Sequence, residues 1–430
     1  MKRLIYIMVG ITILLTTFSG CGLNSFNYSE STGIDVTTPK TILMVLAGQS
    51  TSDAGIEEMI NDVLGLNYPD IELEWECVDW GTKFASQMTA KFAAGDIPDI
   101  MIGKAQDVAT YVPSGNLAPF SKTLTSYVLE QSLPAVTVNG QVYGLPYNAV
   151  YQGVLYNKDI FKEYGIEVPT NQTELKEVVD KLKMHNITPY ASHFQEIWYI
   201  GNITMQFAMN EVFNKYPNWG DMFRNNTVSF NSSSEFRNCV MYNKDIFNAT
   251  WDDAMTINQT ECDKRFANGG GAMYVTGSWS IQTIQEINPN MNVGIFPFPN
   301  QSGDSKLIFE PNITFMKSSK TDYNDAVDKV LELIFSNKNL AVEIFNFTQT
   351  ASLLKDVGPI YPSLIQSDIE QYAKNGMVTD VTTGNTQLIW TFQEDYSKQI
   401  YFWLQGKTEI EDVLEYADQN RHNSISNYNE

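Results

Sequence analysis

Short apolar strand patterns alternate with helical patterns over the first hundred residues of the chain. Residues 41–47 form a continuous apolar run of strand length, and residues 71–78 alternate apolar and polar side chains as a half-buried strand does. Residues 56–64 and 84–92 show the apolar spacing of amphipathic helices, and residues 99–102 form a further short apolar strand pattern. This alternation predicts βαβ units and a mostly parallel sheet.

A second series of such patterns begins after residue 150. The sequence predicts strands over 153–156, 272–276 and 293–296. It predicts helices over 172–184, 203–212, 278–287, 326–335, 340–347, 365–373, 395–404 and 409–420. Two α/β units without an obvious linker predict a chain that crosses between lobes more than once, with a ligand cleft at their boundary.

The amino-terminal residues carry the pattern of a secretory signal. Lys2 and Arg3 precede an apolar stretch over residues 4–18, which is shorter than the roughly 20 apolar residues that span a bilayer. We therefore predict a signal peptide over residues 1–20. An uncleaved amino-terminal anchor is the alternative interpretation.

The residues after this stretch indicate how the mature protein is held. Ser19-Gly20-Cys21 resembles the bacterial lipobox, although Phe18 stands where an aliphatic residue is usual. Residues 21–39 are mostly small and polar, as in a flexible tether. The resemblance implies a palmitate-type lipid attachment at Cys21 and a location on the outer face of the cytoplasmic membrane, because several acyl chains anchor a protein firmly.

Composition excludes several classes of function. The chain has 430 residues, 28 Lys and Arg against 50 Asp and Glu, and a formal net charge of −22. This balance argues against a nucleic-acid binder and against a polybasic membrane-surface protein. Three His and four Cys argue against a metal site, so we expect neither metal nor cofactor. We interpret Cys77, Cys239 and Cys262 as buried thiols, although one disulfide is permitted.

Four motifs follow the tether in a fixed order. Gly95 ends a helix, and Asn139-Gly140 marks a hairpin tip. The motifs are MTAKFAAGDIPDIMI at 88–102, VNGQVYGLP at 138–146, VLYNKDIFKEYGIEVP at 154–169 and GGGAMYVTGSW at 269–279. In this order, behind a lipobox, they resemble the extracellular solute-binding lipoproteins of ABC importers, in the carbohydrate-binding group (family 1) that includes the maltodextrin-binding proteins.

The resemblance covers roughly residues 40–425 and implies a fold and a function. The fold is α/β, a two-lobed periplasmic-binding-protein-like fold of type II with discontinuous lobes joined by hinge segments. The amino-terminal lobe is expected over 40–149 plus 308–347, the carboxy-terminal lobe over 150–307 plus 348–430, and hinges near 146–149 and 349–352. The implied function is capture of a mono- or oligosaccharide by a monomeric, non-enzymatic protein that delivers it to ABC permease subunits.

Aromatic rings and planar polar groups are the side chains that suit a sugar, because they match its C–H faces and its hydroxyls. Trp279 follows a strand end, where an α/β sheet opens its ligand crevice, and the resemblance gives it a stacking role. Residues 194–198 are similar to a cleft-facing segment of the family, which implies hydrogen bonds from Glu196 and stacking by Trp198. By the same resemblance, Trp390 or Phe392 supplies a further aromatic.

Polar contacts are expected from the first lobe. Gln49 and Ser50 follow the first strand, where the family has hydroxyl contacts. Gln106 and Asp107, with Lys104 beside them, stand where maltodextrin-binding members carry charged contacts. The aromatic residue that these members carry is replaced by Gly103, which argues against a maltodextrin ligand. Trp80, as a lid over the cleft or as core, and Tyr147, in the first predicted hinge, complete the candidates.

Three other classes of function remain as alternatives. A secreted carbohydrate-active hydrolase needs two carboxylates, which 50 acidic residues can always provide. The sequence carries no nucleophile elbow, His-Glu-x-x-His or Walker loop, and Gly269-Gly270-Gly271 lacks the Lys-Ser/Thr of a phosphate loop. A metal receptor would have to use His185 and His193, and a peptide receptor would need charged anchors for the peptide termini.

Overall fold

The computed structural model describes residues 39–49, 51, 55–79, 82–358, 361–381 and 390–424. Lys40 to the carboxy terminus forms one compact unit. The predicted signal peptide, the tether up to residue 38 and Cys21 lie outside the described residues. Within the described ranges, no helix is long and apolar enough to cross a membrane.

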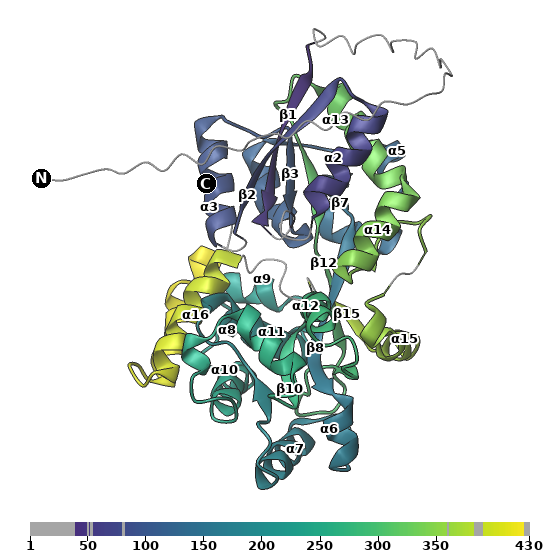
Figure 1. The fold of residues 1–430 in the computed structure, drawn as a ribbon. Coiled ribbons are helices and arrows are strands. Elements are labelled where there is room, and N and C mark those ends of the chain that lie inside the picture. The colour runs from purple at the N-terminus through teal and green to yellow at the C-terminus, as the bar shows by residue number, and fades with distance from the viewer. Residues whose placement is uncertain are drawn as a thin grey trace, which may run out of the picture. The chain divides into compact units, whose positions relative to one another are not determined.

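The first of two large sheets combines early strands with one from the last third of the chain (Figure 1). Its order is β2-β1-β3-β13-β4, with β7 paired to β13. The strands are β1 (Thr41–Gly48), β2 (Ile71–Val78), β3 (Ile100–Gly103), β4 (Leu117–Ala118), β7 (Leu145–Pro146) and β13 (Thr314–Ser318). The pairs β1–β2 and β1–β3 are parallel, as predicted, whereas β13 runs antiparallel to β3.

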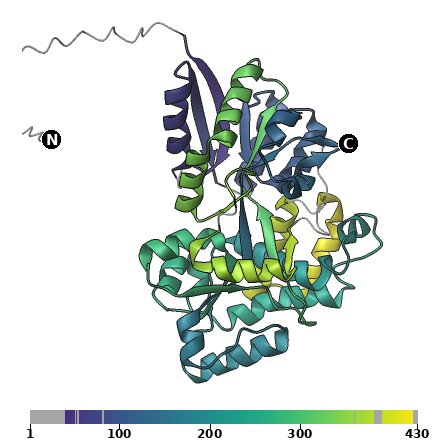
Figure 2. The same ribbon diagram turned by 90° about the vertical axis from the view of Figure 1, so that its right-hand side faces the viewer.

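Helices cover both faces of the first sheet because β1 sends alternate side chains to opposite faces. Leu43 and Val45 pack in a core with α2 (Ile56–Asn67), α13 (Asn324–Ser336) and α14 (Lys338–Thr348). Leu46 packs on the other face in a core with α3 (Thr82–Ala94) and α4 (Val108–Tyr111). The described helices thus sandwich the sheet (Figure 2).

The second sheet is organised around one long strand, β8 (Asn148–Asn157). Its order is β15-β12-β8-β10-β9, and β11 and β14 also pair with β8. The partner strands are β9 (Tyr190–Ala191), β10 (Met273–Gly277), β11 (Val293–Phe296), β12 (Leu307–Pro311), β14 (Ala351–Ser352) and β15 (Val378–Asp380). The strand β8 is antiparallel to β10, β11, β12 and β14, so the parallel pairing of the first strands does not extend to this sheet.

Most of the remaining helices pack around the second sheet. They are α6 (Lys158–Glu163), α7 (Gln172–Met184), α8 (Ile197–Ala208), α9 (Trp219–Arg224), α10 (Ser234–Phe247), α11 (Gln259–Ala267), α12 (Ile281–Ile287), α15 (Gln366–Lys374), α16 (Trp390–Leu404) and α17 (Ile410–Gln419). A π-helical turn, Met209–Phe213, continues α8. Phe392 is buried in an aromatic core with Trp219, Phe223 and Phe230.

The chain passes between the two sheets in three segments that lie side by side. They follow β7, β12 and α14, and the side chain of Asn148 connects them. Asn148 Nδ2 donates to Thr350 Oγ1 at 3.0 Å, and its Oδ1 accepts from the backbone N–H of Ile313 at 2.8 Å. The strand pairing keeps Leu307–Pro311 in the second sheet, whereas the predicted lobe boundary falls at residue 308.

Two smaller predictions are also decided by the structure. Asn139 and Gly140 have positive φ angles of 50° and 76° and join β5 (Thr137–Val138) to β6 (Gln141–Val142), which confirms the hairpin. Cys77, Cys239 and Cys262 form no disulfide with one another; Cys239 and Cys262 are buried as predicted, whereas Cys77 is only partly buried, so the prediction is wrong for that residue.

Candidate functional site

A small pocket is lined by residues from both sheets and by α8. Its cavity volume is about 30 Å³, which is enough for a water molecule, since one needs about 10–15 Å³. The lining residues are Lys104, Gln106, Gln152, Asn202, Met205, Gln206, Met209, Ile308, Glu310, Val381 and Gln393. The pocket therefore combines one residue set that follows β3 with another on β8, β12 and α8.

The strands and the helix direct these side chains for simple geometric reasons. Ile308 on β12 stands opposite Gln152 on β8, so both side chains lie on one face of the sheet. Glu310, two residues further along β12, lies on that same face. The helical residues have the i, i+3, i+4, i+7 spacing of one helix face. They are Asn202, Met205, Gln206 and Met209.

The polar side chains form one continuous ladder. Lys104 Nζ lies 2.8 Å from Oε1 of Glu310, whose side chain is only 3% exposed. Gln152 donates to Oε2 of Glu310, Gln206 donates to Oε1 of Gln152, and Gln206 also donates to Oδ1 of Asn202. Both oxygens of the buried Glu310 carboxylate are thereby satisfied.

One acceptor of this ladder has no donor. Gln206 is 3% exposed, and its Oε1 accepts no hydrogen bond from any described residue. Leaving a buried acceptor unsatisfied costs about 1–3 kcal/mol. Since Gln206 lines the pocket, a water molecule or a ligand hydroxyl there would relieve this cost.

The charged groups of this region are the Lys104 ammonium and the carboxylates of Asp107 and Glu310, and they influence one another. Burial opposes a charge on Lys104, but the Glu310 carboxylate outweighs it and raises the lysine pKa above its usual value. Removal of water raises the pKa of Asp107 to about 6, with Glu310 adding to the effect and Lys104 opposing it. Lys104 is therefore charged at neutral pH and is paired with Glu310.

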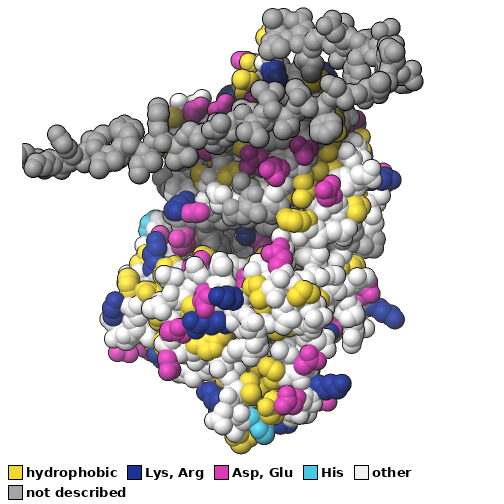
Figure 3. All heavy atoms as spheres, viewed as in Figure 1, with side chains coloured by type: hydrophobic (Ala, Val, Ile, Leu, Met, Phe, Trp, Pro, Cys, Tyr) yellow, Lys and Arg dark blue, Asp and Glu magenta, His cyan; other side chains and the backbone are white. Residues whose placement is uncertain are grey.

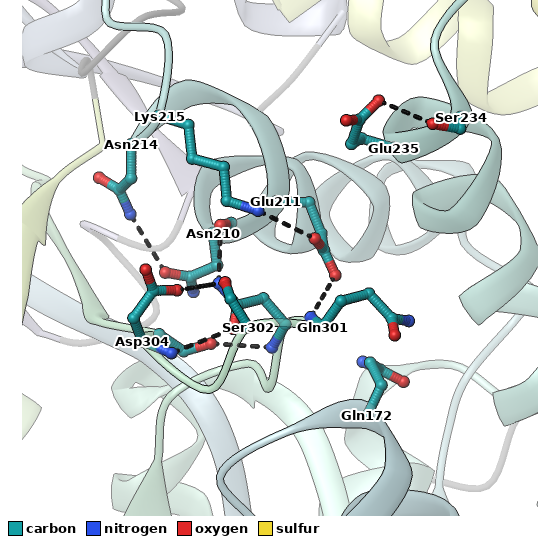
Figure 4. A network of polar contacts seen from close by, with 12 residues as sticks. Gln172, Asn210, Glu211, Asn214, Lys215, Ser234, Glu235, Gln301, Ser302 and Asp304 are labelled. Carbon is teal, nitrogen blue, oxygen red and sulfur yellow. Dashed lines mark hydrogen bonds and ion pairs between the residues drawn. The ribbon is translucent and has the colours of Figure 1, made fainter.

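Buried hydrogen bonds from Asn210 and Glu211, here called the clasp, fix the loop before β12 relative to α8. Asn210, in the π-helical turn, accepts from Lys306 N at 2.9 Å and donates to Lys306 O at 3.1 Å. Glu211 Oε1 accepts from Gln301 N at 2.8 Å (Figure 4). These contacts hold the loop that leads into β12, the strand that carries Glu310, next to the end of α8.

Trp279 follows the strand next to Gln152 of the ladder, although it is not among the residues that line the pocket. The residue lies on a 3₁₀ turn after β10, whose last residue, Gly277, stands opposite Gln152. A Cβ added to Gly277 would lie 2.1 Å from Cζ3 of Trp279, so the indole rests on Gly277. Because paired residues project to one face, the ring lies on the same side of the sheet as Gln152. Ser278 Oγ holds the turn by accepting from Tyr151 N at 3.0 Å.

Glu196 and Trp198 lie at the start of α8. Glu196 Oε2 accepts from Gln259 N, the first residue of α11, at 2.6 Å, and lies 2.8 Å from Nδ1 of the buried His193. Burial favours a neutral Glu196, but His193, Gln259 and Trp198 together lower its pKa below the usual value. The rings of Trp198 and His193 have centroids 5.3 Å apart. Glu196 thus accepts a hydrogen bond from the amino-terminal end of α11.

A buried polar cluster connects these two aromatic regions. Gln259 Nε2 lies 3.5 Å from Oδ2 of Asp263 and 3.4 Å from Oγ of Ser280, which follows Trp279. Burial raises the pKa of Asp263 to about 7, although the Tyr274 hydroxyl, Ser280 and Gln259 act in the opposite direction. Through α11 the Trp198 segment and the Trp279 turn are held by one set of contacts.

The other predicted site residues are distributed differently. Gln106 lines the pocket, and Gln49 follows β1 at a half-buried position. Tyr147 is 1% exposed in the core of the first sheet, where its ring contacts Phe315, Phe335 and Phe345, so the structure does not bring it to the pocket. Ser50, Trp80 and the side chain of Trp390 lie outside what the structure describes. Phe392, the alternative to Trp390, belongs to the buried aromatic core.

Several pocket residues were not predicted from the sequence. They are Gln152, Asn202, Gln206, Glu310 and Gln393. The sequence feature that could have indicated these pocket residues is a polar residue inside an otherwise apolar strand or helix. Gln152 interrupts the buried β8, and Asn202 and Gln206 stand four residues apart in the otherwise mostly buried α8. Among the residues that the structure describes, no group of three His, Cys, Asp or Glu could hold a metal ion.

The fold and the pocket between the two sheets are those of a two-lobed receptor for a soluble ligand. The chain matches the family of bacterial extracellular solute-binding proteins over residues 47–341, and it belongs to this family.

Relatives of known name are distant in sequence. The multiple sugar-binding protein of Streptococcus mutans is 24% identical over 305 residues, which cover 65% of this chain and 67% of that protein. The melibiose/raffinose/stachyose-binding protein MelE of Bacillus subtilis is 22% identical over 317 residues, 67% of this chain and 66% of that protein. The chain thus aligns with about two thirds of the length of each.

Solved structures agree with the two-lobed fold. A chitin oligosaccharide binding protein superimposes with a TM-score of 0.77 at 19% identity, over 90% of this chain and 99% of that chain. A sugar transporter protein of Bacillus licheniformis in complex with stachyose gives a TM-score of 0.76 at 16% identity, over 89% and 100%.

Proposed function

We propose that this protein binds a sugar or oligosaccharide between its lobes and delivers it to the permease of an ABC importer. The observation that carries the proposal is the placement of an indole, Trp279, beside a buried ladder of amide and charged groups. An aromatic face and planar donors and acceptors suit the two kinds of surface that a sugar presents. The sugar-binding relatives and the stachyose complex support this class of ligand.

The proposed mechanism is reversible capture. The cavity of about 30 Å³ is smaller than a sugar ring, so the lobes separate to admit ligand and close on it. Contacts from both lobes favour the closed state, because a ligand shifts an equilibrium only through differential binding. Gln106, Asp107 and Lys104 contact the ligand from one lobe, and Trp279 and Trp198 contact it from the other.

The lobes of the proposed receptor keep the predicted ranges, 40–149 plus 308–347 and 150–307 plus 348–430, except that residues 308–311 belong to the second sheet, so the chain crosses near Asn148, Ile313 and Thr350. The protein acts as a monomer and performs no chemistry on its ligand. Its permease and ATPase partners are separate proteins.

The decisive experiment is a titration of the purified protein with neutral oligosaccharides, followed by intrinsic fluorescence and calorimetry. We expect saturable binding of at least one member, and we expect Trp279→Ala to weaken it by more than about 1 kcal/mol. Trp403→Ala, on α16 beside Lys244, is the matched control and should bind normally. Unchanged affinity in Trp279→Ala would remove this residue from the site. Release of reducing ends would instead support the hydrolase alternative.

Lipid anchoring at Cys21 is a separate part of the proposal. Two or three acyl chains hold a protein stably at a membrane, whereas the polar tether alone has little affinity for it. We expect the protein to fractionate with membranes in the native host and Cys21→Ser to appear in the medium. Equal membrane association of both proteins would contradict the anchor and leave the sugar-binding proposal intact.

A further inference from the structure

The charges of the pocket bear on a property that family membership leaves open, which is whether the ligand is neutral or anionic. We propose that Glu310 makes this pocket selective for uncharged sugars and excludes sugar acids such as uronates. This inference rests on the proposed function, since it names the class of sugar that the same site accepts.

Glu310 occupies a fixed position in the wall of the pocket. Its side chain is 3% exposed, on the strand that forms one wall of the pocket, and its two oxygens are bound by Lys104 and Gln152. In the closed arrangement the carboxylate is therefore a fixed negative group at the pocket, and when the lobes separate it keeps its contact with Gln152 on the same sheet.

The local balance of charge also disfavours an anionic ligand. Lys104 is the cation among the pocket-lining residues, and its ammonium lies 2.8 Å from Glu310. Asp107, which follows it closely in the chain, brings a second carboxylate under the influence of both groups. A ligand carboxylate would therefore meet the Glu310 carboxylate at the pocket wall, with Lys104 paired to it when the lobes are closed. Like charges in a poorly hydrated site repel strongly.

The buried polar groups of the pocket also indicate which hydrogen-bonding groups the ligand carries. Gln206 Oε1 is buried and accepts nothing from the described residues, so it requires a donor. A sugar hydroxyl can donate to it, whereas an ionised carboxylate can only accept. Because sugar acids also carry hydroxyls, this atom indicates a hydroxyl-bearing ligand, and the preference for a neutral one rests on the charge balance.

The wider charge distribution does not offset this preference. The chain carries a formal net charge of −22. On the face shown in Figure 3, basic and acidic side chains are interspersed over the helices of the second sheet rather than segregated by sign. Neither the net field nor this surface supplies a compensating attraction for an anion.

The test compares a neutral sugar with its acid. Calorimetry of the intact protein at pH 7.5 with raffinose, stachyose, maltotriose and chitotriose selects a neutral ligand, and trigalacturonate is the acidic member of the panel. The uronic acid form of that ligand is then titrated under the same conditions. We expect the acid to bind at least about tenfold more weakly, and Glu310→Gln to reduce this ratio at least about threefold. Glu286→Gln, at an exposed position on α12, should leave the ratio unchanged.

A second variant guards against failure of Glu310→Gln to fold. Asp107→Asn removes the other carboxylate at a partly exposed position and should shift the ratio in the same direction. Equal or tighter binding of the acid, or an unchanged ratio in both variants, would overturn the selectivity while leaving sugar binding in place. Binding of no sugar at all would instead overturn the proposed function and this inference with it.

Discussion

Gly277 is the residue on which the position of the Trp279 indole depends. Its missing side chain allows the ring to rest on the backbone of β10, and an added Cβ would lie 2.1 Å from Cζ3. We therefore expect Gly277→Ala to displace the ring and weaken sugar binding about tenfold, which corresponds to about 1.4 kcal/mol. Calorimetry would measure the loss.

The control for this variant is Gly65→Ala. A Cβ on Gly65, in the helix α2, meets no atom within 4 Å. This substitution should raise the free energy of unfolding by about 0.5–1 kcal/mol and leave binding unchanged. Normal affinity in Gly277→Ala would show that the ring position does not matter for the ligand.

Asp263 gives the protein a pH-dependent stability. Its pKa, usually 3.8, is raised to about 7 in the folded protein by burial. The folded state therefore holds the proton more tightly than the unfolded state, so the free energy of unfolding falls as the pH rises from about 4 to 7. We expect Asp263→Asn to be more stable than the parent at pH 8, by up to about 4 kcal/mol, and to differ less at pH 5.

Urea unfolding at pH 5 and pH 8 measures this difference. Asp62→Asn, at an exposed position on α2, controls for the loss of one negative charge. If Asp263→Asn and its parent show parallel pH profiles, then Asp263 is ionised in the folded protein and the buried cluster is arranged differently.

At the scale of single residues, the sequence could predict candidates that depend on local features and could not predict those that depend on contacts between distant elements. Trp279 was named because a strand end and a glycine turn are local features, and its contact with a sugar stays a prediction. Glu310 and Gln206 could not, because a polar residue becomes a pocket residue only when β12 and α8 meet in space. Tyr147 was named for its place in the chain, but its ring fills the first core.

Among the elements, α8 and its π-helical turn carry the largest part of the site. Asn210 donates to the backbone of Phe298 and Lys306 and accepts from Lys306, all in the buried loop before β12. Removing these bonds leaves buried backbone groups unsatisfied, so Asn210→Ala should lower the free energy of unfolding by about 2–4 kcal/mol. Because β12 carries Glu310, sugar affinity should also fall.

Chemical denaturation and calorimetry on the same preparations test both effects. Asn375→Ala, exposed after α15, should change neither quantity. A destabilised Asn210→Ala that binds sugar normally would show that the clasp supports the fold without positioning the pocket.

Elements with a strong pattern were predicted well. The amphipathic helix predicted over 326–335 is α13, and the apolar run at 41–47 is β1. No strand was predicted at β12 or β13, where Glu310 and Lys317 interrupt short apolar runs. Hydrophobic periodicity also carries no information on strand direction, which explains why the antiparallel pairing around β8 was missed.

For the whole molecule, the ion pair between Lys104 and Glu310 connects two sheets that ligand entry must separate. Lys104 follows β3 of the first sheet and Glu310 lies on β12 of the second, with 2.8 Å between the charged atoms. In Lys104→Met the closed arrangement keeps a buried carboxylate without its partner, which is costly. We therefore expect this variant to favour the open arrangement when no ligand is present.

Small-angle X-ray scattering of the ligand-free proteins measures this shift. The radius of gyration of Lys104→Met should exceed that of the parent, and a saturating sugar should reduce it in the parent. Lys398→Met is the matched control. Lys398 pairs with Asp395 within α16, so this substitution removes the same charge without breaking a contact between the sheets. Identical scattering from Lys104→Met and its parent would mean that the crossing segments around Asn148, rather than the ion pair, set the resting position of the lobes.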